Sequence, residues 1–336
     1  MERVTTPLII GHRGASGYRP EHSEESYRLA IRLGVDAIEP DIVATRDGVL
    51  VLRHENEISG TTDVAERSEF ASRRTKKLVD GVPITGWFTE DFTWEELRTL
   101  RTRERLPKLR QHSASFDGQG RILRLDDLLD LLDDSGTGLV AEVKHANYFA
   151  SIGIPLDELI AERLHARSWA NHAKLVVESF EERVLHQLSE RGIGGQRVYL
   201  MERTGAAADL RAQYGSQATT YAQQCSDAGL TALAERVDGV SVDKKILIDT
   251  TTQYPRSTDF IDRAHAAGLL AFTWTLRPEN GFLEKPHRGT GAKADWGDWM
   301  REWGIIIGAG IDGIFVDHPD LGRYAAERAG TAGVKA

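Results

Sequence analysis

Several features that would place a chain in a specialised class of protein are absent or rare in these 336 residues. Cys225 is the only cysteine, so no intramolecular disulfide can form. No apolar run reaches the length of roughly 18 residues that a membrane-spanning helix needs, which argues against an integral membrane protein. The net charge is −9, and nucleic acid is not expected as a partner because its phosphates are bound mainly by Lys and Arg.

An export signal is also absent from the sequence, because residues 1–7 are polar and an apolar run follows at once. If Met1 is the native start, we expect a cytoplasmic protein. A periplasmic or secreted protein whose leader had been removed would have the same sequence. No feature of the chain indicates a particular oligomeric state.

Short apolar runs alternate with amphipathic stretches along most of the chain. The runs are typical of buried parallel strands, and the stretches between them are typical of crossover helices. Eight such strands predict a (β/α)8 TIM barrel, with a doubly wound open sheet as the alternative. The expected strands are 8–11, 37–43, 138–143, 174–178, 197–200, 239–242, 270–274 and 313–316; the expected helices include 24–33, 125–132, 156–167, 181–191, 258–267 and 299–308.

The alternation breaks in a highly charged stretch that also contains Trp87, Phe88 and Phe92. Thr93 followed by Glu96 is the pattern of a capping box and predicts a helix over 94–101. A stretch this long usually has structure or function of its own, although a long decorated loop is the alternative. We therefore expect a barrel formed by residues 1–54 and 120–330, a small insertion after the second strand at 55–119, and a flexible tail at 331–336.

Side chains suited to chemistry gather at the ends of the first two expected strands. His12 and Arg13 follow the first strand, Glu39 and Asp41 lie two residues apart in the second, and His54 follows the apolar run 49–52. Alternate residues of a strand point to the same side, so the two carboxylates are expected to face one site. Histidines for proton transfer, acids for a hard cation and an arginine for an anion together suggest metal-assisted chemistry on a phosphate ester.

Glu142 and Lys144 repeat this spacing at the end of the third expected strand. The carboxylates of Glu39, Asp41 and Glu142 would give an oxygen-lined site for Ca²⁺ or Mg²⁺. Zinc is less expected, because the cluster contains no cysteine and no histidine is interleaved at zinc spacing. Structural salt bridges to Lys144 and to the arginine of the first strand are the alternative. Trp274 ends the seventh strand, where it either lines the pocket or packs in the core.

These residues belong to an ordered series of motifs: His12-Arg13-Gly14, Pro20-Glu21, Glu39-Pro40-Asp41, Arg46-Asp47-Gly48, His54, Glu142-Val143-Lys144, Phe272-Thr273-Trp274-Thr275 and the closing segment 312–319. The series resembles the glycerophosphodiester phosphodiesterase family. Residues 14–22, 62–67 and 89–93 are similar to its bacterial periplasmic-type subgroup. Glu55 and Ser23 depart from the family pattern, which often has Asp and Thr at these positions.

The resemblance implies a TIM barrel with an insertion after strand two. It implies hydrolysis of glycerophosphodiesters, which are small anionic substrates, to glycerol 3-phosphate and an alcohol through a cyclic phosphate. It also implies one divalent metal ion, with Ca²⁺ favoured and Mg²⁺ as the alternative. The site residues that it implies are His12 and His54 for acid–base catalysis, Arg13 and Lys144 for phosphate contact, and Glu39, Asp41 and Glu142 for the metal.

Three other functions are compatible with parts of this pattern. A lysophospholipase D-type or sphingomyelinase D-like phosphodiesterase would need an apolar groove, which aromatic residues of the insertion could supply. A barrel that binds phosphodiesters without catalysis would bury the acids and histidines together for no reaction, at a high cost. A glycosidase would use the paired carboxylates but has no need of His12, His54 and Arg13.

Overall fold

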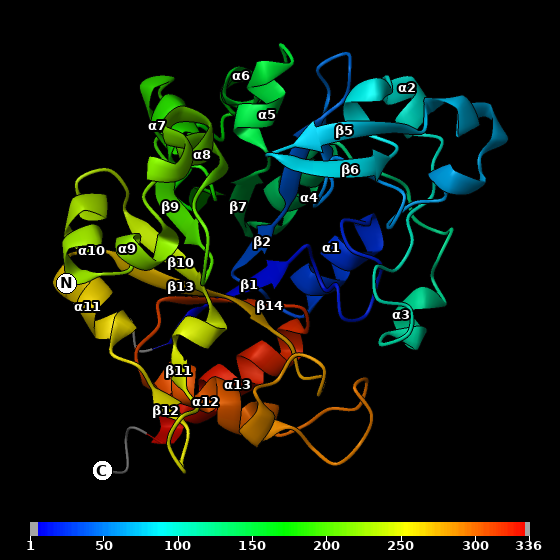
Figure 1. Ribbon diagram of the computed structural model, residues 1–336. Coiled ribbons are helices and arrows are strands. Elements are labelled where there is room, and N and C mark those ends of the chain that lie inside the picture. Colours follow the sequence, from blue (N-terminus) through cyan, green and yellow to red (C-terminus); the bar gives the residue numbers. More distant parts are fainter. Residues whose placement is uncertain (1–5, 333–336) are drawn as a thin grey trace.

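The computed structural model describes residues 6–332, which form a closed barrel of parallel strands surrounded by helices (Figure 1). The second strand is divided into β2 and β3, and the barrel closes because both pieces pair with β7 while β2 also pairs with β1. The predicted TIM barrel is therefore confirmed, and the open sheet is wrong. The barrel strands are β1 (Leu8–His12), β2 (Ala37–Glu39) with β3 (Asp41–Ala44), β7 (Gly138–Val143), β8 (Leu175–Ser179), β9 (Gln196–Met201), β10 (Gly239–Asp243), β13 (Leu270–Leu276) and β14 (Gly313–Val316).

Helices connect the strands and cover the outside of the barrel (Figure 1). The first of them, α1, begins after Ser23, whose hydroxyl accepts a hydrogen bond from the backbone N–H of Ser26. The helices outside residues 55–119 are α1 (Glu24–Arg32), α4 (Leu125–Ser135), α5 (Ala146–Ser151), α6 (Leu156–Ala166), α7 (Glu182–Glu190), α8 (Ala208–Tyr214), α9 (Tyr221–Gln224), α10 (Asp227–Ala234), α11 (Phe260–Ala266), α12 (Trp299–Gly308) and α13 (Pro319–Ala332).

The core has two parts because alternate residues of each barrel strand face opposite ways. Ile9 belongs to the larger cluster between strands and helices, whereas its neighbour Ile10 belongs to a smaller cluster of barrel-strand residues. The other members of the smaller cluster are Ala37, Val140, Val176, Val198, Phe272 and Phe315. The continuous apolar runs of the sequence therefore reflect strands that are buried on both faces.

The chain leaves the barrel after β3, which pairs in antiparallel fashion with β4 (Leu50–Leu52). In the segment expected as an insertion, Glu96 accepts a hydrogen bond from the backbone N–H of Thr93 at 2.9 Å, as the capping box predicts, but the helix ends at Leu97. The elements of residues 55–119 are the short 3-10 helices Val64–Glu66, Ser68–Arg73 and Thr89–Asp91, the hairpin of β5 (Thr75–Val79) and β6 (Val82–Gly86), α2 (Trp94–Leu97) and α3 (Gln111–Ala114).

The described chain ends with α13, so residues 331 and 332 of the expected tail lie in a helix, and 333–336 lie outside the described residues. Across residues 6–332, none of the helices combines the length and the apolar character that crossing a membrane requires.

Leucines at two positions test the packing around the barrel. Leu129 of α4 is fully buried, whereas Leu78 of β5 is 64% exposed. We expect Leu129→Ala to lower the free energy of unfolding by about 2–5 kcal/mol because it leaves a cavity. Leu78→Ala should change it by less than about 0.5 kcal/mol. Urea unfolding followed by circular dichroism measures both, and equal effects would contradict the buried position of α4.

Candidate active site

The carboxyl ends of the barrel strands surround a cavity of ≈ 620 Å³. Such a position is where barrel enzymes place their active sites. Every site residue expected from the sequence lines this cavity except Asp41, which is fully buried. The residues expected there and found in its wall are His12, Arg13, Glu39, His54, Glu142, Lys144 and Trp274.

A sharp turn after β1 brings the first of these side chains together. Gly14 has φ +92°, and a Cβ there would meet backbone atoms of Ser26 at under 3 Å, so only glycine suits the position. The turn lets the backbone N–H of Arg13 donate a hydrogen bond to the Glu39 carboxylate at 2.9 Å. The His12-Arg13-Gly14 motif therefore joins the end of β1 to the end of β2 at the cavity.

His12 is held by a carboxylate from the other end of the chain. Its Nδ1 lies 2.6 Å from Oδ1 of Asp317, the residue that follows β14, and Asp317 also accepts hydrogen bonds from Arg110 and Arg277. Burial, aided by the charge of Arg13, lowers the pKa of His12 to about 4. The imidazole is then neutral at pH 7, and with Nδ1–H donated to Asp317 its Nε2 is left as a base.

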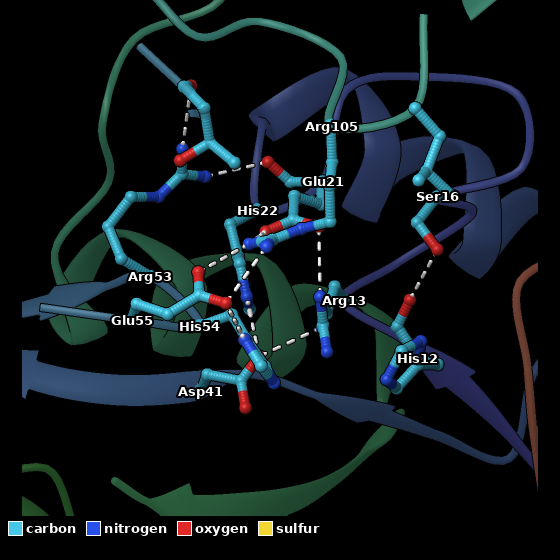
Figure 2. A network of polar contacts seen from close by, with 12 residues as sticks. His12, Arg13, Ser16, Glu21, His22, Asp41, Arg53, His54, Glu55 and Arg105 are labelled. Atoms are coloured by element: carbon cyan, nitrogen blue, oxygen red, sulfur yellow. Dashed lines mark hydrogen bonds and ion pairs between the residues drawn. The ribbon is translucent and has the colours of Figure 1, made fainter. Parts of the chain in front are cut away.

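His54, which follows β4, has a similar arrangement on the opposite side of Arg13 (Figure 2). Its Nδ1 lies 2.6 Å from Oε1 of Glu55, and Arg105 donates two hydrogen bonds to Glu55 and two to Glu21. Glu21 in turn accepts from Arg13 at 2.9 Å. Burial and the charge of Arg13 lower the pKa of His54 to about 3. Glu55, which departs from the family pattern, therefore still fixes the histidine beside it.

Three buried glutamates face one another at the ends of neighbouring strands. Glu39 ends β2, Glu142 lies in β7, and Glu178 lies directly opposite Glu142 in β8. One carboxylate oxygen from each lies within 4.8 Å of the others. Burial raises the pKa of each carboxyl group, to about 8 for Glu142, and the neighbouring acids add to the increase. Such a set of hard oxygen ligands has the chemistry that Ca²⁺ or Mg²⁺ requires.

Asp41 lies beside this cluster, opposite Glu142 in the pairing of β3 with β7. Its Oδ2 accepts a hydrogen bond from Nε2 of His22 at 2.9 Å and lies 3.0 Å from Nε of Arg13. Burial alone would raise the pKa of Asp41, but Lys144 and Arg13 hold it well below its usual range. Its Oδ1 has no hydrogen-bond partner among the described residues and lies 3.5 Å from Nζ of Lys144.

Arg13 and Lys144 both form the ion pairs that the sequence suggested as an alternative to substrate contact. Arg13 pairs with Glu21 and Asp41, and Nζ of Lys144 donates to Glu142 at 2.7 Å. Both side chains nevertheless line the cavity. The two roles are therefore compatible, because each cation offsets buried acids and still faces the space where an anion would bind.

Trp274 takes up both positions that the sequence allowed for it. It packs edge-to-face against Phe180, with ring centroids 5.5 Å apart, and both rings line the cavity. Its indole N–H has no hydrogen-bond partner within residues 6–332. The contact of Trp274 with substrate stays a prediction.

The β5–β6 hairpin reaches the cavity as well. Asp80 at its turn places Oδ2 2.5 Å from Nδ1 of His145, and both residues line the cavity wall. By contrast, Trp87, Phe88 and Phe92 are buried and do not line it. These aromatic residues therefore pack in the core and do not form an apolar groove at the cavity.

Sequence reasoning missed Glu178 and the residues that hold the two histidines. Glu178 could have been found, because it ends an expected barrel strand as Glu142 does. Asp317 lies in the closing segment 312–319, for which the sequence predicts no role. Arg105 and Arg110 lie in an irregular stretch, and their partners are distant in sequence, so no local pattern identifies them.

Comparisons with known proteins agree on one family. The profile of the glycerophosphoryl diester phosphodiesterase family matches residues 12–321. A glycerophosphodiester phosphodiesterase of Arabidopsis thaliana is 27% identical, with 94% of this chain and 84% of the relative covered, and one of Bacillus subtilis is 25% identical with the same coverage.

Solved structures of related proteins have the same fold. A putative glycerophosphoryl diester phosphodiesterase of Silicibacter pomeroyi has a TM-score of 0.67 at 20% identity, covering 98% of this chain and 95% of that one. A phosphodiesterase of Oleispira antarctica, in complex with its product sn-glycerol-3-phosphate, has a TM-score of 0.60 at 18% identity, covering 96% and 97%.

Arg105 should stabilise the fold through its two carboxylate partners. Arg105→Met leaves Glu21 and Glu55 without these donors, and we expect the free energy of unfolding to fall by about 1–3 kcal/mol. The control is Arg98→Met, which removes an exposed pair with Glu95 and should cost less than about 1 kcal/mol. Chemical denaturation of both variants checks this; losses of equal size would mean that the Arg105 network adds nothing.

Proposed function

This chain belongs to the glycerophosphoryl diester phosphodiesterase family, and from that premise we propose that it hydrolyses glycerophosphodiesters to glycerol 3-phosphate and an alcohol by histidine acid–base catalysis. The observation that carries the proposal is the pair His12 and His54. Each imidazole is fixed through Nδ1 by a carboxylate, and both line one cavity with a cluster of buried acids. Two positioned imidazoles are what a reaction with two proton transfers needs.

A glycerophosphodiester carries its own nucleophile, the glycerol 2-hydroxyl beside the phosphate. We assign His12 as the base that removes the hydroxyl proton: its Nδ1 is held by Asp317, which leaves Nε2 of the neutral imidazole to accept a proton. The new imidazolium is stabilised by Asp317, to which it is hydrogen bonded. The hydroxyl oxygen then attacks phosphorus, the bond to the other alcohol breaks, and a cyclic glycerol phosphate forms.

We assign His54 as the acid that protonates the departing alcohol. The charges of Arg13 and Lys144 contribute to the low pKa of its imidazole in the free protein. An anionic phosphate bound to these two cations would offset their repulsion of a protonated His54. The pKa of His54 would then rise toward the value that a general acid needs at neutral pH. Water would then open the cyclic phosphate with the two histidines in reversed roles.

Arg13 and Lys144 are assigned to the phosphate oxygens, because charged donors in a buried cavity stabilise developing negative charge strongly. The same cavity suits one divalent cation held by Glu39, Asp41 and Glu142, with Ca²⁺ favoured over Mg²⁺. Buried oxygens of Glu39 and Asp41 that lack hydrogen-bond partners in the described chain support this assignment. Such a cation supplies polarisation of a phosphoryl oxygen and neutralisation of charge.

Replacing either histidine tests the mechanism. We expect kcat for glycerophosphocholine to fall by roughly 10²–10⁴ in His12→Asn and in His54→Asn, because each loses a proton-transfer group. His186→Asn is the control, since His186 is 70% exposed on α7. Release of glycerol 3-phosphate is measured with a coupled assay and folding by circular dichroism. Near-normal turnover in a folded His12 or His54 variant would refute the assignment.

Removing metal tests the cation. We expect excess EDTA to abolish turnover, and Ca²⁺ or Mg²⁺ to restore it when added beyond the chelator. Full activity after exhaustive treatment with EDTA would remove the metal from the mechanism.

A comparison of substrates tests the substrate class. Glycerophosphocholine, lysophosphatidylcholine and an aryl glycoside are assayed side by side, and turnover is expected for glycerophosphocholine. A preference for lysophosphatidylcholine would identify a lysophospholipase D-type enzyme, and release of the aryl group would identify a glycosidase. Binding of glycerophosphocholine without turnover would indicate a non-catalytic barrel.

A further inference from the structure

Glu178 is a buried acid of the cavity to which the mechanism gives no role. Its side chain is 1% exposed, at the end of β8, and one of its oxygens lies within 4.8 Å of carboxylate oxygens of Glu39 and Glu142. Its Oε2 has no hydrogen-bond partner in the described part of the chain, and no Lys or Arg there lies within ion-pair distance of it. Glu178 thus points into the acid cluster with no direct ion-pair or hydrogen-bond partner for Oε2, and Lys144 offsets its charge only from a distance.

The surroundings of other buried glutamates show that this fold normally supplies a partner. Glu181, three residues further along, accepts a hydrogen bond from the backbone N–H of Asn147 at 2.9 Å. Ionised carboxylates are costly to bury without hydrogen-bond donors or a cation. The burial of Glu178 without such a partner therefore needs an explanation. The other buried glutamates with charged partners are Glu21 with Arg13 and Arg105, Glu90 with Lys77, Glu142 with Lys144, Glu279 with Arg110, and Glu302 with Lys244.

The charges around the cluster do not balance within the protein. Glu39, Asp41, Glu142 and Glu178 provide four carboxylates, and the cations in contact with this group are Lys144 and the arginine after β1. If all four were ionised, two negative charges would be in excess even with both cations assigned wholly to the cluster, and burial and mutual repulsion accordingly raise the pKa of Glu39, Glu142 and Glu178. One divalent cation would neutralise that excess, and unpaired oxygens on Glu39 and Glu178 are available to bind it.

We propose that Glu178 is a further ligand of the divalent cation, in addition to Glu39, Asp41 and Glu142. The inference rests on the proposed function for the presence of a cation. A fourth carboxylate favours Ca²⁺, which takes six to eight oxygen ligands, over Mg²⁺, which retains much of its water. Glu178 is therefore a determinant of metal affinity and of the choice between these two ions.

Calcium titration of metal-free protein tests the proposal directly. Isothermal titration calorimetry should show that Glu178→Gln weakens Ca²⁺ binding by at least about 10-fold, because one charged ligand is lost. The same substitution should weaken Mg²⁺ binding less, so the ratio of Ca²⁺ affinity to Mg²⁺ affinity should fall. Glu181→Gln is the matched control. Glu181 is also a buried glutamate, lies just after β8 and is outside the acid cluster, so we expect this variant to bind Ca²⁺ with wild-type affinity.

Thermal unfolding separates loss of a ligand from loss of the fold. In EDTA, Glu178→Gln should melt at or above the wild-type temperature, because a carboxyl group that is costly to bury among other acids has been replaced by a neutral amide. With saturating Ca²⁺ its increase in Tm should be smaller than that of the wild type. Glu178→Asp, which keeps the charge on a shorter side chain, should give Ca²⁺ affinity between those of the wild type and Glu178→Gln.

The outcomes distinguish this inference from the proposed function. If the wild type binds Ca²⁺ and Glu178→Gln binds it within twofold of the wild type, Glu178 is not a ligand, while the proposed function is unaffected. If the wild type binds neither Ca²⁺ nor Mg²⁺ yet hydrolyses substrate, the metal assignment and this inference both fail. If Glu181→Gln weakens Ca²⁺ binding as much as Glu178→Gln does, the inference is also overturned.

Discussion

Pairing of buried carboxylates with arginines is the interaction on which the mouth of this barrel depends. Buried Glu21 and Asp317 and the half-buried Glu55 would each be costly to remove from water as charged groups, and each is offset by one or two guanidinium groups. Planar guanidinium groups suit this task because they can donate to two carboxylates at once, as Arg105 does. Glu55 and Asp317 in turn fix the two imidazoles that line the cavity, so the orientation of both rings depends on the ion pairs around them.

The same interaction connects residues 55–119 to the active-site cavity of the barrel. Arg105 binds the carboxylate that holds His54, and Arg110 binds the carboxylate that holds His12. The segment between β4 and α4 therefore positions both histidines indirectly, through the carboxylates that bind them. Its hairpin also contributes Asp80 to the cavity wall. The division of this chain into a barrel and an insertion stays a prediction, but the two parts share one network of charges.

Particular residues show what the sequence could and could not predict. The strands at 138–143 and 313–316 have the bounds expected from their apolar runs, since burial on both faces leaves a strong local signal. The expected strand at 37–43 is divided at Pro40, which lacks the N–H that a continuous strand would use. The ion pair of Arg110 with Asp317 joins residues 207 positions apart, and no local sequence pattern predicts a contact of that range.

The pairing of β1 with β14 joins the first and last strands of the barrel, and the contact between His12 and Asp317 lies at the same seam. A growing chain on the ribosome that has not yet produced its last strand has the imidazole but not the carboxylate that orients it. His12 is therefore oriented only after β14 has been made and has closed the ring of strands.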